Sequence, residues 1–145
     1  MNMGKVLAAS LVLSGLGAGV GVYYLQVYGF YDDVSDSAVI TMNGAPLALR
    51  DLRAIDSESS PIRFRACFQL AVLPDAPVYA EPTPLTGPEW FDCYDAGALT
   101  AALEGGQAQA YLSQGEIRDG VDRVIAVFPD GRAFAWHQLN EKYRD

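Results

Sequence analysis

The sequence contains little charge, one histidine and two cysteines. Of its 145 residues, 50% are hydrophobic and only 19% are charged, a balance typical of membrane-associated chains. One histidine and two cysteines exclude most zinc sites with several protein ligands. Basic residues number 10 against 18 acidic ones, so the formal net charge is -8. This shortage of clustered Lys and Arg argues against nucleic acid as a partner and against a polybasic membrane anchor.

No charged residue occurs from Val6 to Leu25, a run of 20 residues. A helix of that length spans roughly 30 Å, the thickness of one hydrocarbon core. Lys5 precedes the run and no basic residue follows it until Arg50, which predicts a cytoplasmic N-terminus. We therefore predict a transmembrane anchor over residues 1–31 and an extracytoplasmic domain over residues 32–145. The aromatic belt of this anchor would comprise Tyr23, Tyr24, Tyr28, Phe30 and Tyr31.

A cleaved signal peptide is the alternative interpretation of the same segment. Its charged region would be Met1 to Lys5 and its apolar region Val6 to Leu16, with small residues following. The segment has no A-x-A cleavage site, and the apolar run continues to Leu25. Both interpretations place the domain in the same compartment.

The predicted anchor is rich in small residues, which fall on two opposite faces of a helix. Both faces contain small-xxx-small spacings, which allow another helix to approach closely. Chance occurrence of such short patterns is the alternative. The predicted helix-packing residues are Ser10, Ser14, Gly17 and Gly21 on one face, with Gly15 and Gly19, beside Gly4 and Ala8, on the other.

Residues 32–145 predict an α+β domain: a small antiparallel sheet of four to five strands with two helices. Strands are expected where apolar residues alternate, and a helix where they recur every three to four residues. Five prolines over residues 74–88 predict a long surface loop. The expected strands are 38–42, 62–70, 107–112, 121–128 and 132–139, and the expected helices are 46–55 and 96–104.

Local signals fix several of these elements. Pro46 can occupy the first turn of the helix over 46–55, in which Leu47, Leu49, Leu52 and Ile55 have helical spacing. Asp95 can cap the helix over 96–104, and Gly105-Gly106 would end it. Pro129-Asp130-Gly131 predicts a tight turn between the last two strands.

Cys67 and Cys93 are expected to form a structural disulfide if the domain faces an oxidising compartment. The bond would tether a proline-rich loop that has few other ways to anchor itself. Free buried thiols remain an alternative, and so does a redox or metal-binding role. A redox pair usually has C-x-x-C spacing, which this pair lacks.

His137 lies in the last predicted strand, and we expect a hydrogen-bonded histidine at the surface or at an interface. Aromatic residues near it and near the proline loop belong by default to the core. An exposed subset would form a docking surface. The candidates for that surface are Trp90, Phe91, Trp136 and His137. Acidic pairs such as Asp119/Asp122 match no calcium-loop pattern.

The chain resembles an uncharacterised family of small single-pass membrane proteins from alphaproteobacteria. The resemblance covers nearly the whole length and depends on an apolar run ending in YYLQVYGFY, and on AIDSESSPIRFRACF, PEWFDCYDA and IRDGVDRVIAVFPDGRAFAWHQLN. It implies a Gram-negative inner membrane and a periplasmic domain, and no established activity. Members are sometimes labelled histidine kinase, but this sequence has no ATP-binding glycine boxes and its one histidine lies in a predicted strand.

These observations favour a non-catalytic, membrane-anchored periplasmic protein. It would act as an accessory subunit or assembly factor of a larger inner-membrane complex, with respiratory complexes as candidates by location. Its partners would be the bilayer and the transmembrane helices of that complex, with no cofactor and no small-molecule substrate indicated. The alternative is a thiol- or metal-handling factor that uses Cys67, Cys93 and His137. A third hypothesis is an anchored sensor or hydrolase with a deep pocket.

Overall fold

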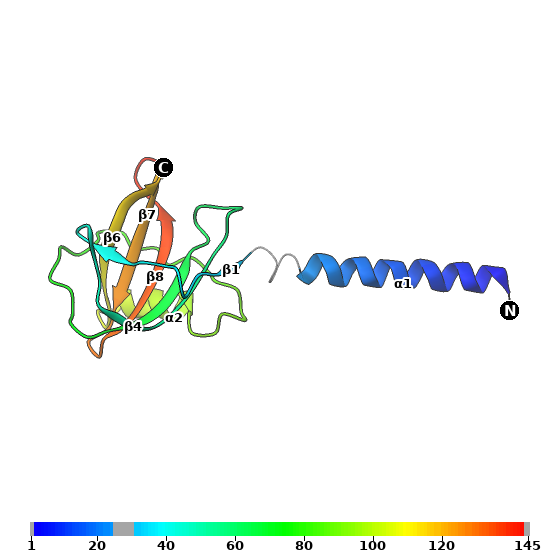
Figure 1. The fold of residues 1–145 in the computed structure, drawn as a ribbon, viewed down its shortest axis with the longest axis horizontal. Helices are drawn as coiled ribbons and strands as arrows, with labels where there is room; N and C mark the ends of the chain where they lie inside the picture. Colours follow the sequence, from blue (N-terminus) through cyan, green and yellow to red (C-terminus); the bar gives the residue numbers. More distant parts are fainter. Residues whose placement is uncertain (1, 25–30, 144–145) are drawn as a thin grey trace. The chain divides into compact units, whose positions relative to one another are not determined.

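The computed structural model describes residues 2–24 and 31–143, which fall into two compact units, Met1–Tyr31 and Asp32–Asp145. The first unit contains helix α1 (Met3–Tyr24), which has 22 residues (Figure 1). By length and composition α1 can cross a membrane, with a mean hydropathy of 1.8. Tyr28 and Phe30 of the predicted aromatic belt lie outside the described residues.

The second unit is built on a six-stranded antiparallel sheet with the order β1-β4-β5-β8-β7-β6 (Figure 1). The α+β class and the antiparallel sheet are confirmed, with six strands where four to five were expected. Its strands are β1 (Asp32–Asp33), β4 (Leu49–Asp56), β5 (Arg65–Leu70), β6 (Gln109–Arg118), β7 (Val121–Val127) and β8 (Arg132–Leu139). Outside the sheet are a short hairpin of β2 (Thr41–Met42) and β3 (Ala45–Pro46), and helix α2 (Ala96–Glu104).

The sheet is buried on both sides, because separate segments of the chain cover its two faces. One face, the Phe64 face, contains Phe64, Ala66, Phe68 and Ala135 and packs against Ile40 and other residues of segment 34–47. The opposite face, the Cys67 face, contains Cys67, Phe134 and Trp136. The register supports this division, since Ala66 pairs with Ala135 and Cys67 pairs with Phe134. In Figure 1 the cyan β2–β3 region lies in front of the sheet and α2 lies behind it.

The helix predicted over 46–55 is wrong, because most of this segment forms β4. A bulge between Arg50 and Arg53 places three steps of β4 opposite two steps of β5. Asp51 adopts a positive φ of 58° within this bulge. The extra residue places Leu49 and Leu52 on the same face of the sheet, where both pack against the core. A spacing of three therefore arises in a bulged strand and imitates the spacing of a helix.

The predictions over the second half of the domain are confirmed. Helix α2 has the predicted bounds, and the side chain of Asp95 accepts a hydrogen bond from the backbone N–H of Ala98 at 3.0 Å. The hairpin of β7 and β8 forms around residues 128–131. Three strand predictions differ in length: the strand expected over 38–42 is limited to β2, that over 62–70 begins at Arg65 as β5, and that over 107–112 extends to Arg118 as β6.

Gly131 provides a test of the hairpin, because it has a φ of +91° and a Cβ there would lie 2.6 Å from the carbonyl oxygen of Leu70. We expect Gly131→Ala to lower the free energy of unfolding by about 3 kcal/mol or more. Gly106→Ala is the matched control, since Gly106 has a φ of +79° with nothing within 4 Å of the added Cβ. It should cost only about 1 kcal/mol. Urea unfolding of the detergent-solubilised chain measures both, and equal losses would contradict the predicted steric conflict.

Candidate functional site

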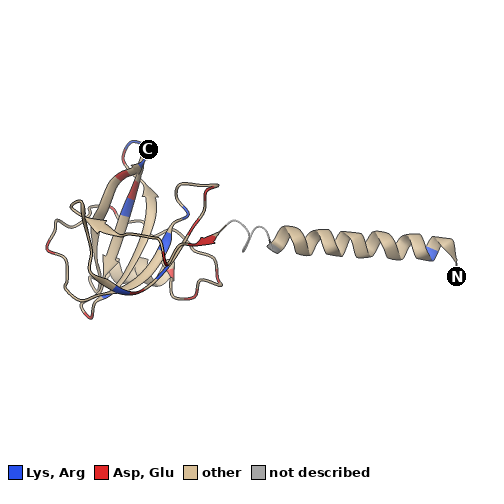
Figure 2. Ribbon diagram, in the orientation of Figure 1, with Lys and Arg blue, Asp and Glu red and all other residues tan. Residues whose placement is uncertain are grey.

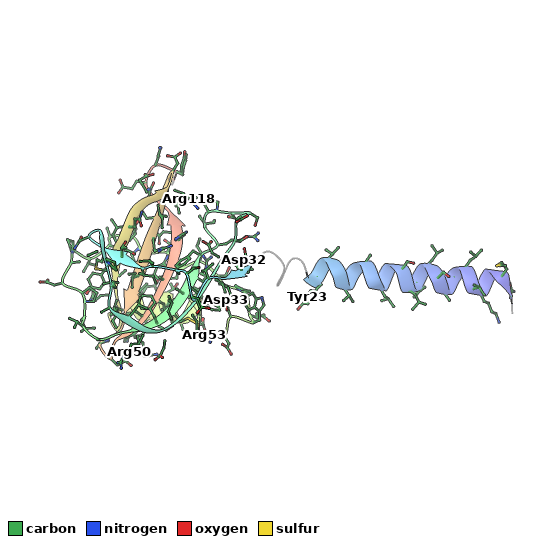
Figure 3. The ribbon with its side chains drawn as sticks, viewed as in Figure 1. Tyr23, Asp32, Asp33, Arg50, Arg53 and Arg118 are labelled. Carbon is green, nitrogen blue, oxygen red and sulfur yellow. A yellow bond between two sulfur atoms is a disulfide. The ribbon has the colours of Figure 1, made fainter. Side chains whose placement is uncertain are left out.

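The surface of α1 is apolar and fully exposed in the described unit. Lys5 is the only charged residue of α1 (Figure 2). Side chains extend from all sides of the helix (Figure 3). The six predicted helix-packing residues are all exposed, and a Cβ added at any of the four glycines would meet nothing within 4 Å. These residues are Ser10, Ser14, Gly15, Gly17, Gly19 and Gly21. Such a helix requires lipid or another helix around it, because water would otherwise contact its entire apolar surface.

Cys67 and Cys93 are joined by a disulfide, as predicted. Cys67 lies on β5, and Cys93 lies in the connection between the proline-rich loop and α2. The bond therefore attaches the end of this loop to the middle of the sheet. In the loop-entropy model, closing a loop of this length stabilises the fold by roughly 3–4 kcal/mol.

Buried polar side chains of the sheet also hold the proline-rich loop. Gln138 is 2% exposed, and its Oε1 accepts hydrogen bonds from the backbone N–H of Thr83 at 2.7 Å and from Trp136 Nε1 at 2.9 Å. Gln138 Nε2 donates to the carbonyl of Glu81 at 3.0 Å. One amide side chain thus satisfies two backbone groups of the loop, which has a single β-bridge to the sheet, between Val78 and Tyr111 of β6.

Arg65 holds the next part of the loop. Its Nε and Nη2 donate to the carbonyl of Thr86, at 3.2 and 2.9 Å, and its Nη1 donates to the carbonyls of Ile62 and Phe64. Its guanidinium lies over the ring of Tyr94, whose hydroxyl donates to the carbonyl of Leu85 at 2.7 Å. Burial raises the pKa of Tyr94, so its hydroxyl remains protonated as a donor. The expectation that this loop has few anchors besides the disulfide was therefore wrong.

Three of the four candidates for a docking surface are buried and therefore cannot form one in this structure. Trp136 is 0% exposed, Phe91 3% and His137 5%, while Trp90 is half-buried. The proline-rich loop and the segment that follows it cover the Cys67 face; Trp136 is buried beneath this cover, and Phe91 is a buried residue of the cover itself. The default assignment of these aromatic residues to the core is the correct one.

His137 is buried on the other face of the sheet and has a partner at each ring nitrogen. Its Nε2 accepts a hydrogen bond from Arg123 Nε at 3.1 Å, and its Nδ1 lies 2.8 Å from the carbonyl oxygen of Pro61. Its ring stacks on Phe64 with centroids 4.8 Å apart. The predicted hydrogen bonding is therefore correct, and the predicted surface position is not.

The geometry separates the three residues of the predicted thiol or metal site. Cys67 pairs with Phe134 on the Cys67 face, whereas His137 is three residues further along β8 and points to the Phe64 face. The sheet therefore lies between the histidine and the disulfide. Across residues 2–24 and 31–143, no group of three or more His, Cys, Asp or Glu side chains is arranged to hold a metal ion.

A surface cleft of ≈ 350 Å³ lies beside β6 and β7, and its polar groups bind one another. Asp122 accepts hydrogen bonds from Tyr79 Oη at 2.8 Å, from the backbone N–H of Glu116 at 3.0 Å and from Asn140 Nδ2 at 3.1 Å. Glu116 in turn accepts from Gly120 N and Asn140 Nδ2. Asp119, which the sequence analysis paired with Asp122, instead binds Lys142 and Tyr143. These hydrogen bonds therefore hold the C-terminal segment and the proline-rich loop against the β6–β7 hairpin.

Gln138→Met tests whether a single buried amide holds the loop. The variant keeps the volume but leaves Thr83 N–H and Trp136 Nε1 without their acceptor, so the free energy of unfolding should fall by about 2–4 kcal/mol. Proteolytic cleavage within residues 79–88 should also accelerate. Gln114→Met, at an exposed position, is the control and should change stability by less than about 0.5 kcal/mol. Unchanged stability and cleavage in Gln138→Met would show that the disulfide, Arg65 and the other contacts of the loop restrain it without this amide.

Comparison with known proteins places the folded domain in a family without an assigned activity. Residues 36–145 match DUF6446, a family of unknown function. No curated protein and no solved structure matches the chain significantly. The match covers most of the chain and includes the disulfide, the proline-rich loop and His137. The chain belongs to the DUF6446 family of unknown function.

Proposed function

We propose that this protein is a non-catalytic, membrane-anchored accessory subunit or assembly factor of a larger inner-membrane complex. Its domain, residues 32–145, would lie in the periplasm of a Gram-negative bacterium, and the resemblance to an alphaproteobacterial single-pass family agrees with this location. Respiratory complexes are candidates because they occupy the same membrane. The partner would be recognised in two places, by α1 within the bilayer and by the domain above it.

The observation that carries this proposal is the exposed surface of α1. An anchor that serves only for attachment needs apolar bulk, whereas α1 has Gly15, Gly17, Gly19 and Gly21 within two turns. Glycine lowers helix propensity, and its smallness benefits a helix mainly where a neighbouring backbone approaches closely. The two stripes of small residues lie on opposite faces, which suits a helix held between neighbours better than a simple pair.

The disulfide supports a periplasmic location. Disulfides persist in oxidising compartments and are rare in the cytosol. Lys5, before the apolar segment, favours a cytoplasmic N-terminus by the positive-inside rule.

The thiol- or metal-handling alternative has less support. It requires Cys67, Cys93 and His137 to act at one place, and the sheet separates the histidine from the disulfide. Both ring nitrogens of His137 are also engaged by protein groups. A single accessible site built from these residues would need the core to open.

Thiol trapping in intact cells tests the predicted side of the membrane. In the full-length chain both cysteines should resist alkylation until reductant is added, because they are oxidised in the periplasm. Deletion of residues 2–24 should retain the domain in the cytoplasm, where both thiols should react without reductant. Two reactive thiols in the full-length protein would place the domain on the reducing side and contradict the proposal.

Pull-down of the tagged full-length protein in mild detergent tests the partner. Gly17→Leu and Gly19→Leu each place a large side chain in one stripe of small residues. Both variants keep the helix apolar and should remain in the membrane, but the added bulk should prevent binding of a stoichiometric membrane partner. Ala9→Leu is the matched control, because residue 9 lies about 80° from either stripe. It should retain the partner.

The outcomes separate the two claims. Recovery of the wild-type chain alone would contradict the subunit proposal. Equal retention of a partner by all three variants would leave the subunit role intact and assign the contact to the domain instead of α1.

A further inference from the structure

His137, Arg123 and Phe64 form a compact cluster on the Phe64 face, which the proposed function does not use. The guanidinium of Arg123 lies 4.0 Å from the centroid of the Phe64 ring, and the imidazole of His137 stacks on the same side chain. Arg123 Nε donates to His137 Nε2 at 3.1 Å. All three side chains are buried. A titratable ring thus accepts a hydrogen bond, inside the core, from a guanidinium that is charged at neutral pH, since burial lowers the pKa of Arg123 only to about 10.

This contact fixes the tautomer of His137. A guanidinium can only donate hydrogen bonds, so Nε2 must be the unprotonated nitrogen of a neutral ring. The proton is then on Nδ1, where it is donated to the carbonyl of Pro61 at 2.8 Å. A second proton could bind only at Nε2. It would place two N–H donors and two positive charges against each other across 3.1 Å, so the contact with Arg123 would be lost.

Two covering segments contact this cluster. Arg123 Nη1 donates to the carbonyl of Val39 at 3.1 Å, which fastens segment 38–42 over the sheet. This segment also contains β2, which pairs with β3 and whose Thr41 carbonyl accepts a hydrogen bond from Ser113 Oγ. His137 holds Pro61 in the connection between β4 and β5. The central strands are held differently, by backbone ladders that pair β5 with β8 and β8 with β7. Loss of the cluster would therefore loosen the two covering segments before it disrupts the sheet.

We propose that His137 is an acid-sensitive latch: a second proton on its ring releases segments 38–42 and 57–62 from the Phe64 face while the strands β5, β7 and β8 stay paired. Arg123 would turn toward solvent, and Phe64 and Ile40 would become accessible. The latch does not depend on the function proposed above. In a periplasmic domain it would respond directly to the pH of the medium.

Burial and the surrounding charges together set the direction of the response. The positive charges of Arg123 on β7, Arg65 on β5 and Arg118 at the end of β6 (Figure 3) act on the ring. Burial and, to a smaller extent, these charges outweigh the hydrogen bond to Pro61, which raises the pKa of His137, and lower it to about 4. Asp56, at the end of β4, is the carboxylate that faces these arginines, and burial raises its pKa. It therefore becomes neutral at a higher pH than an ordinary aspartate, and it does not drive the opening, because a carboxyl whose pKa is raised in the closed state favours that state in acid.

The sign of the pH dependence follows from linkage. The ring has a lower pKa in the closed state than when released, where it approaches 6.5. The stability that the neutral ring contributes is thus fully present above pH 6.5 and is lost as the pH falls toward 4. Between pH 7.5 and pH 5 the opening equilibrium should rise roughly 30-fold.

Hydrogen–deuterium exchange of the full-length chain in detergent micelles tests the latch, with rates corrected for the intrinsic effect of pH. Peptides covering 38–42 and 57–62 should exchange roughly 30-fold faster, relative to intrinsic rates, at pH 5 than at pH 7.5. Peptides from β7 and β8 should keep their protection. His137→Gln, which retains an acceptor but does not titrate, should show less than about a twofold change. Asp56→Asn should respond like the wild type, because the titrating group is His137.

Three results would overturn the proposal: no acid response in the two segments, an equal response in His137→Gln, or a simultaneous loss of protection in all strands. A second measurement remains decisive if His137→Gln does not fold. Nitrogen-15 shifts of the wild-type imidazole at pH 7.5 should show a proton on Nδ1 and none on Nε2. A proton on Nε2 at that pH would exclude the latch.

Discussion

The structure of the domain depends on one constraint: both faces of a single sheet are buried, and the segments that cover them are mostly irregular. Backbone groups in irregular segments have no ladder partner, and burying them unpaired would cost roughly 1–3 kcal/mol each. The sheet supplies these partners through its own side chains. On the Cys67 face they are Gln138 and Arg65, beside which the disulfide at Cys67 attaches the cover covalently, and on the Phe64 face they are Arg123 and His137.

This constraint explains why polar side chains occupy the interior of a chain that is poor in charge. Arg65 and Arg123 are both buried, and their guanidinium groups donate to backbone carbonyls of covering segments. A guanidinium suits this role because it presents five donors in a rigid plane and can also stack on an aromatic ring. Each arginine does stack, on Tyr94 and on Phe64 respectively. The disulfide is therefore one of several contacts that hold the proline-rich loop on the Cys67 face, and its loss alone would leave this loop partly attached.

The sequence predicted elements whose signals are local and missed those set by distant contacts. Helix α2 and the β7–β8 hairpin depend on Asp95 and on Gly131, which act within a few residues. Strand β4 was mistaken for a helix, since its bulge at Asp51 is visible only against the register of β5. The burial of Trp136 and His137 depends on segments more than 40 residues away in the sequence. Only the alternation of β8 hinted that these two neighbours point to opposite faces.

The filled faces also restrict where the domain can recognise a partner. A curved sheet often binds through an open face, but here Ile40 fills one face and the disulfide-linked cover closes the other. Contacts with a partner must therefore use α1, the loops or the edges of the sheet, unless a cover is released. The two covers differ in this respect. Gln138, Arg65 and the disulfide hold one by bonds that do not titrate near neutral pH, whereas the neutral ring of His137 holds part of the other. The Phe64 face is thus the one that a change in the surroundings can open.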